Sequence, residues 1–102
     1  MSSKLSYYKL SKEADFDLDD IFDYTEIEFV FNQAVKYLSG LDTVFESLVK
    51  NPEIGRKRNE LRLGLYSLTE QEHIIFYRIV DEYIRIVRVL HGHKDIPRNF
   101  MK

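Results

Sequence analysis

The sequence predicts an α+β fold in which a first strand and an antiparallel helical hairpin precede a three-stranded antiparallel meander. Apolar residues recur at steps of three and four through two segments between residues 11 and 51, which is the period of an amphipathic helix. Residues 73–80 and 83–91 are rich in β-branched residues, and only Asp81 and Glu82 separate them. Two residues are the length of a tight hairpin, so these segments are expected to be neighbouring strands of one sheet.

The N-terminal half is predicted to begin with a short strand at residues 5–10 and a first helix. Ser11 is placed to cap this helix through its hydroxyl. Glu13 and Asp15 follow in the first turn, where the positive end of the helix dipole favours negative charge. The buried stripe of the first helix is expected to consist of Ala14, Leu18, Ile21, Phe22, Thr25 and Phe29.

The second helix has a more regular apolar stripe than the first. Asn32 is expected to cap it, and Asn51 ends it, because a residue before proline avoids the helical conformation. The link at residues 30–32 is so short that the two helices are expected to form an antiparallel hairpin. The predicted buried residues are Ala34, Tyr37, Leu38, Leu41, Val44, Phe45 and Leu48.

The meander is predicted to start with a strand at residues 61–68, because leucines alternate through LRLGLYSL. A basic loop at residues 52–59 precedes this strand, and a polar turn at 69–72 follows it. The last two strands are apolar on both faces, whereas two helices can cover only one face of a four-stranded sheet. Either sheet curvature and the basic loop cover the other face, or that face is a groove for a partner segment.

Length and composition are those of one globular domain, expected to span residues 1–102. The chain contains no cysteine, which excludes disulfides and thiolate metal sites. No run approaches the ~18 apolar residues of a membrane span, and the N-terminus lacks the apolar core of a signal peptide. A cytoplasmic location without membrane contact is therefore expected.

Charge is unevenly distributed along a chain whose formal net charge is −2. Acids dominate residues 12–28, whereas bases dominate residues 50–62 and 83–102. The acidic block is expected to be the solvated face of the first helix, and the two basic blocks are expected to converge on one anion-attracting surface. Because there is no overall basic excess, direct sequence-specific binding of nucleic acid is not expected.

Five segments resemble, in order and separation, those of ParE-type toxins of the RelE/ParE superfamily, the toxic halves of bacterial toxin–antitoxin modules. They are YKLSKEADFDLDDIFDYT (residues 8–25), QAVKYLSGL (33–41), NPEIGRKRNELRLGLYS (51–67), HIIFYRI (73–79) and IVRVLHGHKDIPR (86–98). The resemblance covers nearly the whole chain. It implies an antiparallel sheet packed on a helical hairpin, which agrees with the fold expected from the residues.

By this resemblance, the chain is expected to inhibit DNA gyrase by binding rather than by catalysis. A cognate ParD-like antitoxin is expected to neutralise it, and such modules serve plasmid stabilisation. The alternative is the RelE-like branch, which consists of ribosome-dependent mRNA endoribonucleases. His91, Arg62 and Arg88 would then be the catalytic groups. Two features argue against this alternative: no tyrosine follows Tyr83, and the loop RKRNE lacks a lysine-rich block.

No metal and no other cofactor are expected. His91, His93 and Asp95 follow one another at spacings of two, and His-x-His is a plausible metal pair. However, Gly92 interrupts the extended geometry that would align these side chains, and the tail offers no fourth ligand.

Two sets of residues are predicted to bind protein partners. Arg85 and Arg88 are three positions apart and are expected on opposite sides of the sheet, so Arg85 is assigned to an ion pair with the acidic first helix. Gyrase is expected to contact Arg62, Arg88, His91, Lys94 and Arg98. An amphipathic, acidic antitoxin segment is expected to cover the hairpin and an exposed sheet face at Leu63, Leu65, Phe76, Tyr77, Ile84 and Ile86.

Overall fold

The computed structural model describes residues 5–28 and 31–92, and their arrangement confirms the α+β class predicted from the sequence. Strand β1 covers Tyr7–Leu10, and the helices α1 and α2 cover Lys12–Glu28 and Phe31–Lys50. The remaining strands are β2 (Arg56–Lys57), β3 (Leu65–Glu70), β4 (His73–Val80) and β5 (Tyr83–His91).

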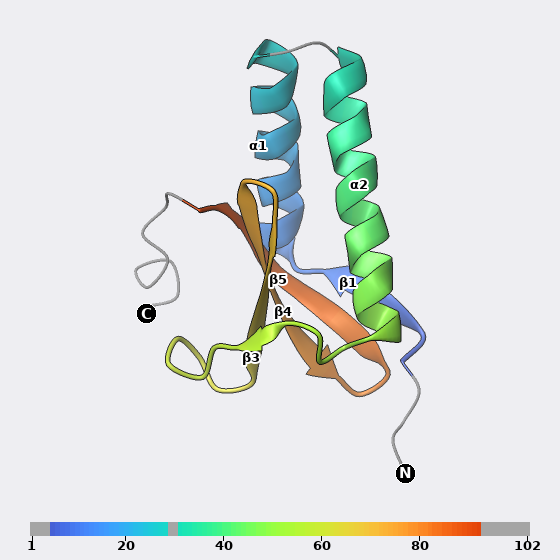
Figure 1. Cartoon of the computed structure of the whole chain (residues 1–102), viewed down its shortest axis with the longest axis vertical. Coiled ribbons are helices and arrows are strands. Elements are labelled where there is room, and N and C mark those ends of the chain that lie inside the picture. The colour runs from blue at the N-terminus through green and yellow to red at the C-terminus, as the bar shows by residue number, and fades with distance from the viewer. Residues whose placement is uncertain (1–4, 29–30, 93–102) are drawn as a thin grey trace.

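The strands form one sheet in the order β1-β5-β4-β3-β2. β1 runs parallel to β5, and the other neighbours are antiparallel. The predicted meander is therefore β3-β4-β5, with β1 added beside its last strand. The short β2 beside its first strand was not predicted. Figure 1 shows the two helices as an antiparallel hairpin beside the sheet.

The helices begin close to the predicted positions. Ser11 caps α1 as expected, because its Oγ accepts a hydrogen bond of 2.9 Å from the backbone N–H of Ala14. The prediction for α2 was wrong by two residues, since a cap at Asn32 would start the helix at Gln33, whereas α2 starts at Phe31 and Asn32 lies inside its first turn. Helix ends fray, and a capping residue in the sequence does not by itself fix which turn comes first.

The main core lies between the hairpin and one face of the sheet. The apolar stripes of α1 and α2 that periodicity predicts form the helical side of this core. Burying each large apolar side chain stabilises the fold by about 1.5–3 kcal/mol. The predicted stripe residues are buried or half-buried throughout, apart from Phe29, which lies outside the described residues. The fully buried members of this core are Ala14, Ile21, Leu41, Phe45, Leu48, Ile75, Tyr77, Ile84, Ile86 and Val89.

A smaller core occupies part of the opposite face. Leu65, Phe76 and Leu90 are buried there, and Leu61 from the segment before β3 packs against them. The guanidinium of Arg58 lies 5.8 Å from the ring centroid of Phe76. Over this part of the sheet, the segment before β3 therefore covers the face that points away from the helices. This is one of the two explanations given above for strands that are apolar on both faces.

The strand predicted at residues 61–68 begins later than expected. Residues 61–64 form a turn, in which the backbone N–H of Gly64 donates to Oδ1 of Asn59 at 2.9 Å. Gly64 has a φ of +84°, a conformation that a strand does not contain and that glycine adopts without strain. Leucine alternation gave the wrong start because Leu63, which fits the pattern, is exposed in this turn.

A β-bulge changes which side chains share a face of β5. Phe76 pairs with Arg88, whereas Tyr77 pairs with Ile86, so Val87 is the extra residue. Arg85 pairs with Arg78, two positions from Phe76 on β4. Paired residues share a face, as do residues two apart, so Arg85 and Arg88 leave the sheet on the same side. The prediction that they point to opposite sides was wrong because parity counting assumes an unbroken strand.

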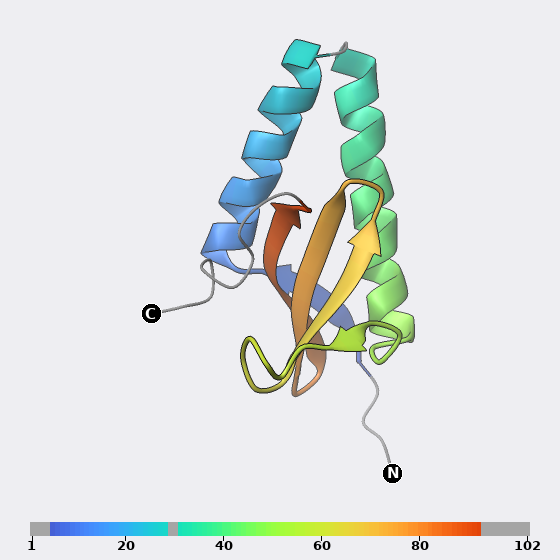
Figure 2. The same ribbon diagram turned by 60° about the vertical axis from the view of Figure 1, so that its left-hand side comes forward.

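The hairpin extends beyond the sheet. In Figures 1 and 2, the ends of α1 and α2 that are joined rise past the strands. Tyr24, Ile27, Phe31 and Val35 are 59 %, 80 %, 56 % and 42 % exposed, respectively. We call these four residues the tip surface.

Candidate functional site

The tip surface is an exposed apolar area formed by the end of α1 and the start of α2. The ring of Phe31 packs edge-on against the ring of Phe22, with the centroids 5.8 Å apart. This contact holds the Phe31 side chain in place. Asp19, Asp20 and Asp23 are exposed on the same helix, and α1 has no basic residue in its last turn. The tip surface is therefore an exposed apolar area with carboxylates on the neighbouring turns of α1.

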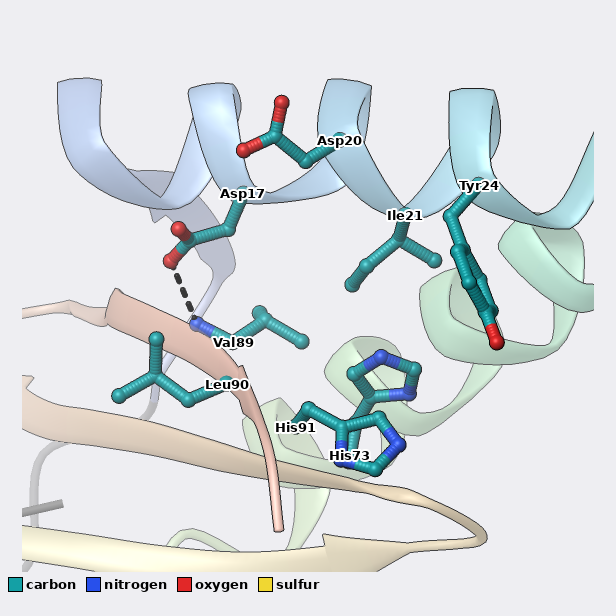
Figure 3. Close-up of a pocket in the computed structure, with 8 residues that line it drawn as sticks. All are labelled: Asp17, Asp20, Ile21, Tyr24, His73, Val89, Leu90 and His91. Atoms are coloured by element: carbon teal, nitrogen blue, oxygen red, sulfur yellow. Dashed lines mark hydrogen bonds between the residues drawn. The ribbon is translucent and has the colours of Figure 1, made fainter. Parts of the chain in front are cut away.

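A hollow of about 260 Å³ lies beside the tip surface, between α1 and the end of β5. Figure 3 shows Ile21 and Tyr24 pointing from α1 towards the imidazoles of His73 and His91. A neighbouring hollow of about 190 Å³ shares Tyr24 and His73 and reaches α2 and the β3–β4 turn. The larger hollow is lined by Asp17, Asp20, Ile21, Tyr24, His73, Val89, Leu90 and His91.

The two histidines form a cross-strand pair, and each ring also lies close to one further polar side chain. His73 and His91 face each other in the β4–β5 register, with ring centroids 5.4 Å apart and edge-on. Nδ1 of His73 lies 2.6 Å from the hydroxyl of Tyr37, and Nε2 of His91 lies 3.3 Å from Oε1 of Glu72. Burial, together with Glu70 and Glu72, raises the pKa of Tyr37 to about 12. The Tyr37 hydroxyl thus keeps its proton, and it also lies 3.4 Å from the backbone carbonyl of Glu70, to which it can donate.

The pKa of His73 is lowered, chiefly by burial and secondarily by the nearby His91, while Glu72 opposes the shift. An unfolded chain therefore takes up a proton at His73 more readily than the folded chain does. The stability that neutral His73 contributes is present above pH ~6.5 and is lost as the pH falls below that value.

We expect the urea concentration at the midpoint of unfolding to be lower at pH 5.5 than at pH 7.5. This difference should be smaller in His73→Gln than in wild type. The comparison of the two proteins isolates His73 from the carboxylates that also titrate. The groups facing His73 are Tyr37, His91, Glu70 and Glu72. His91→Gln is the matched control, because it removes one neighbour of His73 and leaves His73 itself in place. This variant should keep part of the difference in urea midpoint between the two pH values. An equal pH dependence in wild type and His73→Gln would contradict the assignment.

Asp17 joins α1 to the free edge of β5. β1 pairs with β5 only as far as Ile86, and beyond it the backbone N–H of Val89 donates to Oδ2 of Asp17 at 2.9 Å. Nε and Nη2 of Arg88 donate to the two carboxylate oxygens at 2.8 and 2.9 Å. Bidentate contact of this kind is strong and geometrically specific. The ion pair with the first helix, predicted for Arg85, is therefore made by Arg88.

The other predicted partner-binding residues are spread over the fold. Arg62 is half-buried in the turn before β3, and His91 is at the far end of β5. Lys94 and Arg98 lie outside the described residues. Five of the six predicted antitoxin contacts are side chains of the two cores rather than of a surface, and only Leu63 is exposed. These five are Leu65, Phe76, Tyr77, Ile84 and Ile86.

Tyr77 illustrates why two-sided apolarity did not indicate a surface. Its ring is fully buried, its hydroxyl donates to the carbonyl of Pro52 at 2.9 Å, and the N–H of Gly55 donates to the same hydroxyl at 2.9 Å. A Cβ at Gly55 would lie 2.4 Å from that hydroxyl, so only glycine allows this approach. Tyr77 thus fastens the loop after α2 to the sheet.

Within residues 5–28 and 31–92, no three His, Asp or Glu side chains are grouped so as to hold a metal ion. His93 and Asp95, which were weighed with His91 as metal ligands from the sequence, lie outside these ranges. Neither α1 nor α2, as far as the structure describes them, is long and apolar enough to cross a membrane.

The arrangement of sheet and hairpin has a counterpart among solved structures. A chain of a chromosomal ParDE toxin–antitoxin system from P. aeruginosa superimposes with a TM-score of 0.74. The match covers 86 % of this chain and 96 % of that chain at 21 % sequence identity. The molecule therefore has the fold of a component of such a system.

The sequence identifies which component this is. The family model of the ParE toxin of the type II toxin–antitoxin system parDE matches residues 8–96, and the chain belongs to this family. Toxin ParE1 of Mycobacterium tuberculosis (strain H37Rv) is 39 % identical over 95 residues, covering 92 % of this chain and 97 % of the relative. Toxin ParE1 of Caulobacter vibrioides is 37 % identical over 84 residues, covering 82 % and 86 %.

Proposed function

We propose that this toxin inhibits DNA gyrase by binding it, without catalysing a reaction, and that a ParD-like antitoxin neutralises it. Family membership supports the toxin role. The observation that favours binding over RNA cleavage is the placement of His91, Arg62 and Arg88, which would be the catalytic groups of a nuclease. These three side chains do not converge.

The register of β4 separates two of them. His91 faces His73 at one end of β4, whereas Leu65, three residues after Arg62, faces Arg78 five positions further along. Five residues of an antiparallel strand span about 17 Å, which is far more than one phosphodiester. This register counts against the part of the expectation that brings Arg62 and His91 to one surface. The third group, Arg88, already has its guanidinium on Asp17.

The antitoxin is proposed to cover the tip surface and the adjoining hollows. These offer exposed apolar side chains and an opening into which a side chain of the partner can insert, whereas the predicted sheet residues are buried. Asp20 and Asp23 are exposed on α1, about one turn before Tyr24 and Ile27 of the tip surface. The segment that docks there is thus expected to combine apolar with basic residues, which replaces the earlier expectation of an acidic segment for this part of the interface.

The target is tested by two assays run on the same preparation. Purified toxin should inhibit supercoiling by DNA gyrase, and toxin that has first been mixed with the antitoxin should not inhibit it. The purified toxin should also leave mRNA intact in a ribosome-dependent cleavage assay. His91→Ala should behave as wild type does in the cleavage assay. Cleavage of mRNA that disappears in His91→Ala, with supercoiling unaffected, would instead place the chain in the nuclease branch.

A further inference from the structure

The face of the sheet that points away from the helices is open at one end and carries a row of three cations. Lys9 on β1 faces Arg85 on β5, and Arg85 faces Arg78 on β4, so the three lie side by side across neighbouring strands. All three side chains are exposed. Like charges placed directly opposite each other in a sheet destabilise it, so this row costs stability in the absence of an anion.

Acidic side chains do not neutralise the row in the part of the chain that the structure describes, where none forms an ion pair with these three cations. Helix α1 packs against the other face, and its Asp17 pairs with Arg88 at the free edge of β5 rather than with the row. The row is bounded on one side by the turn before β3, since a Cβ on Gly64 would lie 3.6 Å from Nη2 of Arg78. The small core at Phe76 closes the face further along the strands.

Two tyrosines lie next to the row on the same face. Tyr7 faces Tyr83 in the β1–β5 register, two positions before Lys9 and Arg85. Their rings are stacked, with centroids 5.3 Å apart and planes inclined by 11°. Nζ of Lys9 lies 5.3 Å from the centroid of Tyr83, and Tyr7 is exposed. The open end of the face therefore combines a cation row with an accessible aromatic stack.

We propose that this surface, made of Lys9, Arg78, Arg85, Tyr7 and Tyr83, binds single-stranded nucleic acid. The three cations span about 10 Å across three strands and would contact backbone phosphates. The tyrosine stack would receive a base, since every base has a π-face and such stacking is tolerant of sequence. An acidic peptide would satisfy the cations but would leave the aromatic stack unused, and for this reason we favour nucleic acid.

This activity would be independent of sequence and distinct from the proposed inhibition of gyrase. It does not conflict with the net charge of −2, because Lys9, Arg78 and Arg85 share one face of the sheet while most of the acids lie on α1 and α2. It is also separate from the histidine pair, since Arg85 and His91 are six positions apart on β5.

The binding test uses the full-length chain and a fluorescein-labelled dT12 oligonucleotide, followed by fluorescence anisotropy. Three phosphate contacts predict a slope of about −2 for the logarithm of the binding constant against that of salt concentration. The affinity should thus weaken roughly 20-fold between 50 and 200 mM salt. A dodecapeptide of Asp and Glu is the competing probe and should bind at least roughly tenfold more weakly, because it cannot stack.

Two sets of variants locate the site. Arg78→Gln with Arg85→Gln should reduce the salt slope to about −0.7 without lowering the melting temperature, because it removes two facing like charges. Lys12→Gln with Lys36→Gln changes the net charge equally, at exposed helical positions, and should leave binding nearly unchanged. Tyr7→Leu should weaken binding about tenfold, whereas Tyr7→Phe, which keeps the ring, should bind as wild type does.

Three results would overturn the proposal. The first is equal or tighter binding of the acidic peptide, which would make the surface a site for a protein segment. The second is an equal loss in the helical control pair, which would indicate diffuse electrostatics rather than a built site. The third is wild-type affinity in Tyr7→Leu, which would remove the base-stacking role.

Discussion

Asp17→Ala should lower the free energy of unfolding by about 3 kcal/mol, although Asp17 belongs to the acidic block that the sequence assigns to solvent. The carboxylate has two tasks that alanine cannot perform. It pairs bidentately with Arg88, and it accepts the N–H of Val89 beyond the end of β1. Removing one partner of a buried pair costs about 3–5 kcal/mol, and an orphaned buried N–H adds about 1–3. The side chains of Arg88 and Asp17 are 21 % and 11 % exposed, so screening by solvent should reduce the loss from the lower end of the summed range, about 4 kcal/mol, to about 3 kcal/mol.

Chemical denaturation of three variants separates these contributions. Arg88→Ala should cost less than Asp17→Ala, about 1.5 kcal/mol, because Asp17 remains to accept the N–H of Val89. Arg85→Ala is the matched control, since it removes an exposed arginine three positions away on the same face. It should change stability by less than about 0.5 kcal/mol. A loss in Arg85→Ala as large as that in Arg88→Ala would show that the ion pair with α1 is not the stabilising contact.

The same variants bear on function. If Arg88 acts in the ion pair with Asp17, growth inhibition by Arg88→Ala should decline only as far as the folded fraction declines, and lowering the temperature should restore it. If Arg88 contacts gyrase, as the sequence-based hypothesis has it, inhibition of supercoiling should be lost even where the variant is fully folded. Supercoiling assays at two temperatures distinguish these outcomes.

Helical periodicity carried most of the correct predictions. The stripes of both helices, the cap at Ser11 and the two-residue connection at Asp81 and Glu82 are local features, each written in a few adjacent residues. Local chemistry decides them: a hydroxyl reaches an N–H three residues on, and apolar side chains at steps of three and four share a face. For these parts of the fold, the sequence was sufficient.

The surfaces could not be predicted in the same way, because they depend on features without a local signal. Val87 looks like an ordinary strand residue, yet as the bulge it moves Arg88 to the face of Arg85. The row formed by Lys9, Arg78 and Arg85 exists only because β1 pairs in parallel with β5, which joins residues far apart in the chain. Similarly, the exposure of Ile27 follows from the length by which the hairpin exceeds the sheet (Figure 2).

The antitoxin interface should respond most strongly to a change at Ile27 of the tip surface. Ile27→Lys is expected to reduce the affinity for the antitoxin by more than about 100-fold, which corresponds to roughly 2.7 kcal/mol. An apolar anchor in the centre of an interface carries a loss of this size when a charge replaces it. Lysine is chosen because it suits the C-terminal end of a helix and would repel the basic partner segment expected there. Loss of binding would then not result from fraying of α1.

Leu63→Lys is the matched control, because Leu63 is also 80 % exposed and is the one accessible residue of the antitoxin set predicted from the sequence. Both variants exchange an exposed aliphatic side chain for the same charge, so only location differs between them. Titration calorimetry with the antitoxin should show a large loss for Ile27→Lys and a change of less than about threefold for Leu63→Lys. The reverse pattern would place the antitoxin at the turn before β3, as the sequence suggested. Equal losses in both variants would mean that the antitoxin wraps from the tip to that turn, and the tip surface would then be one end of a longer interface.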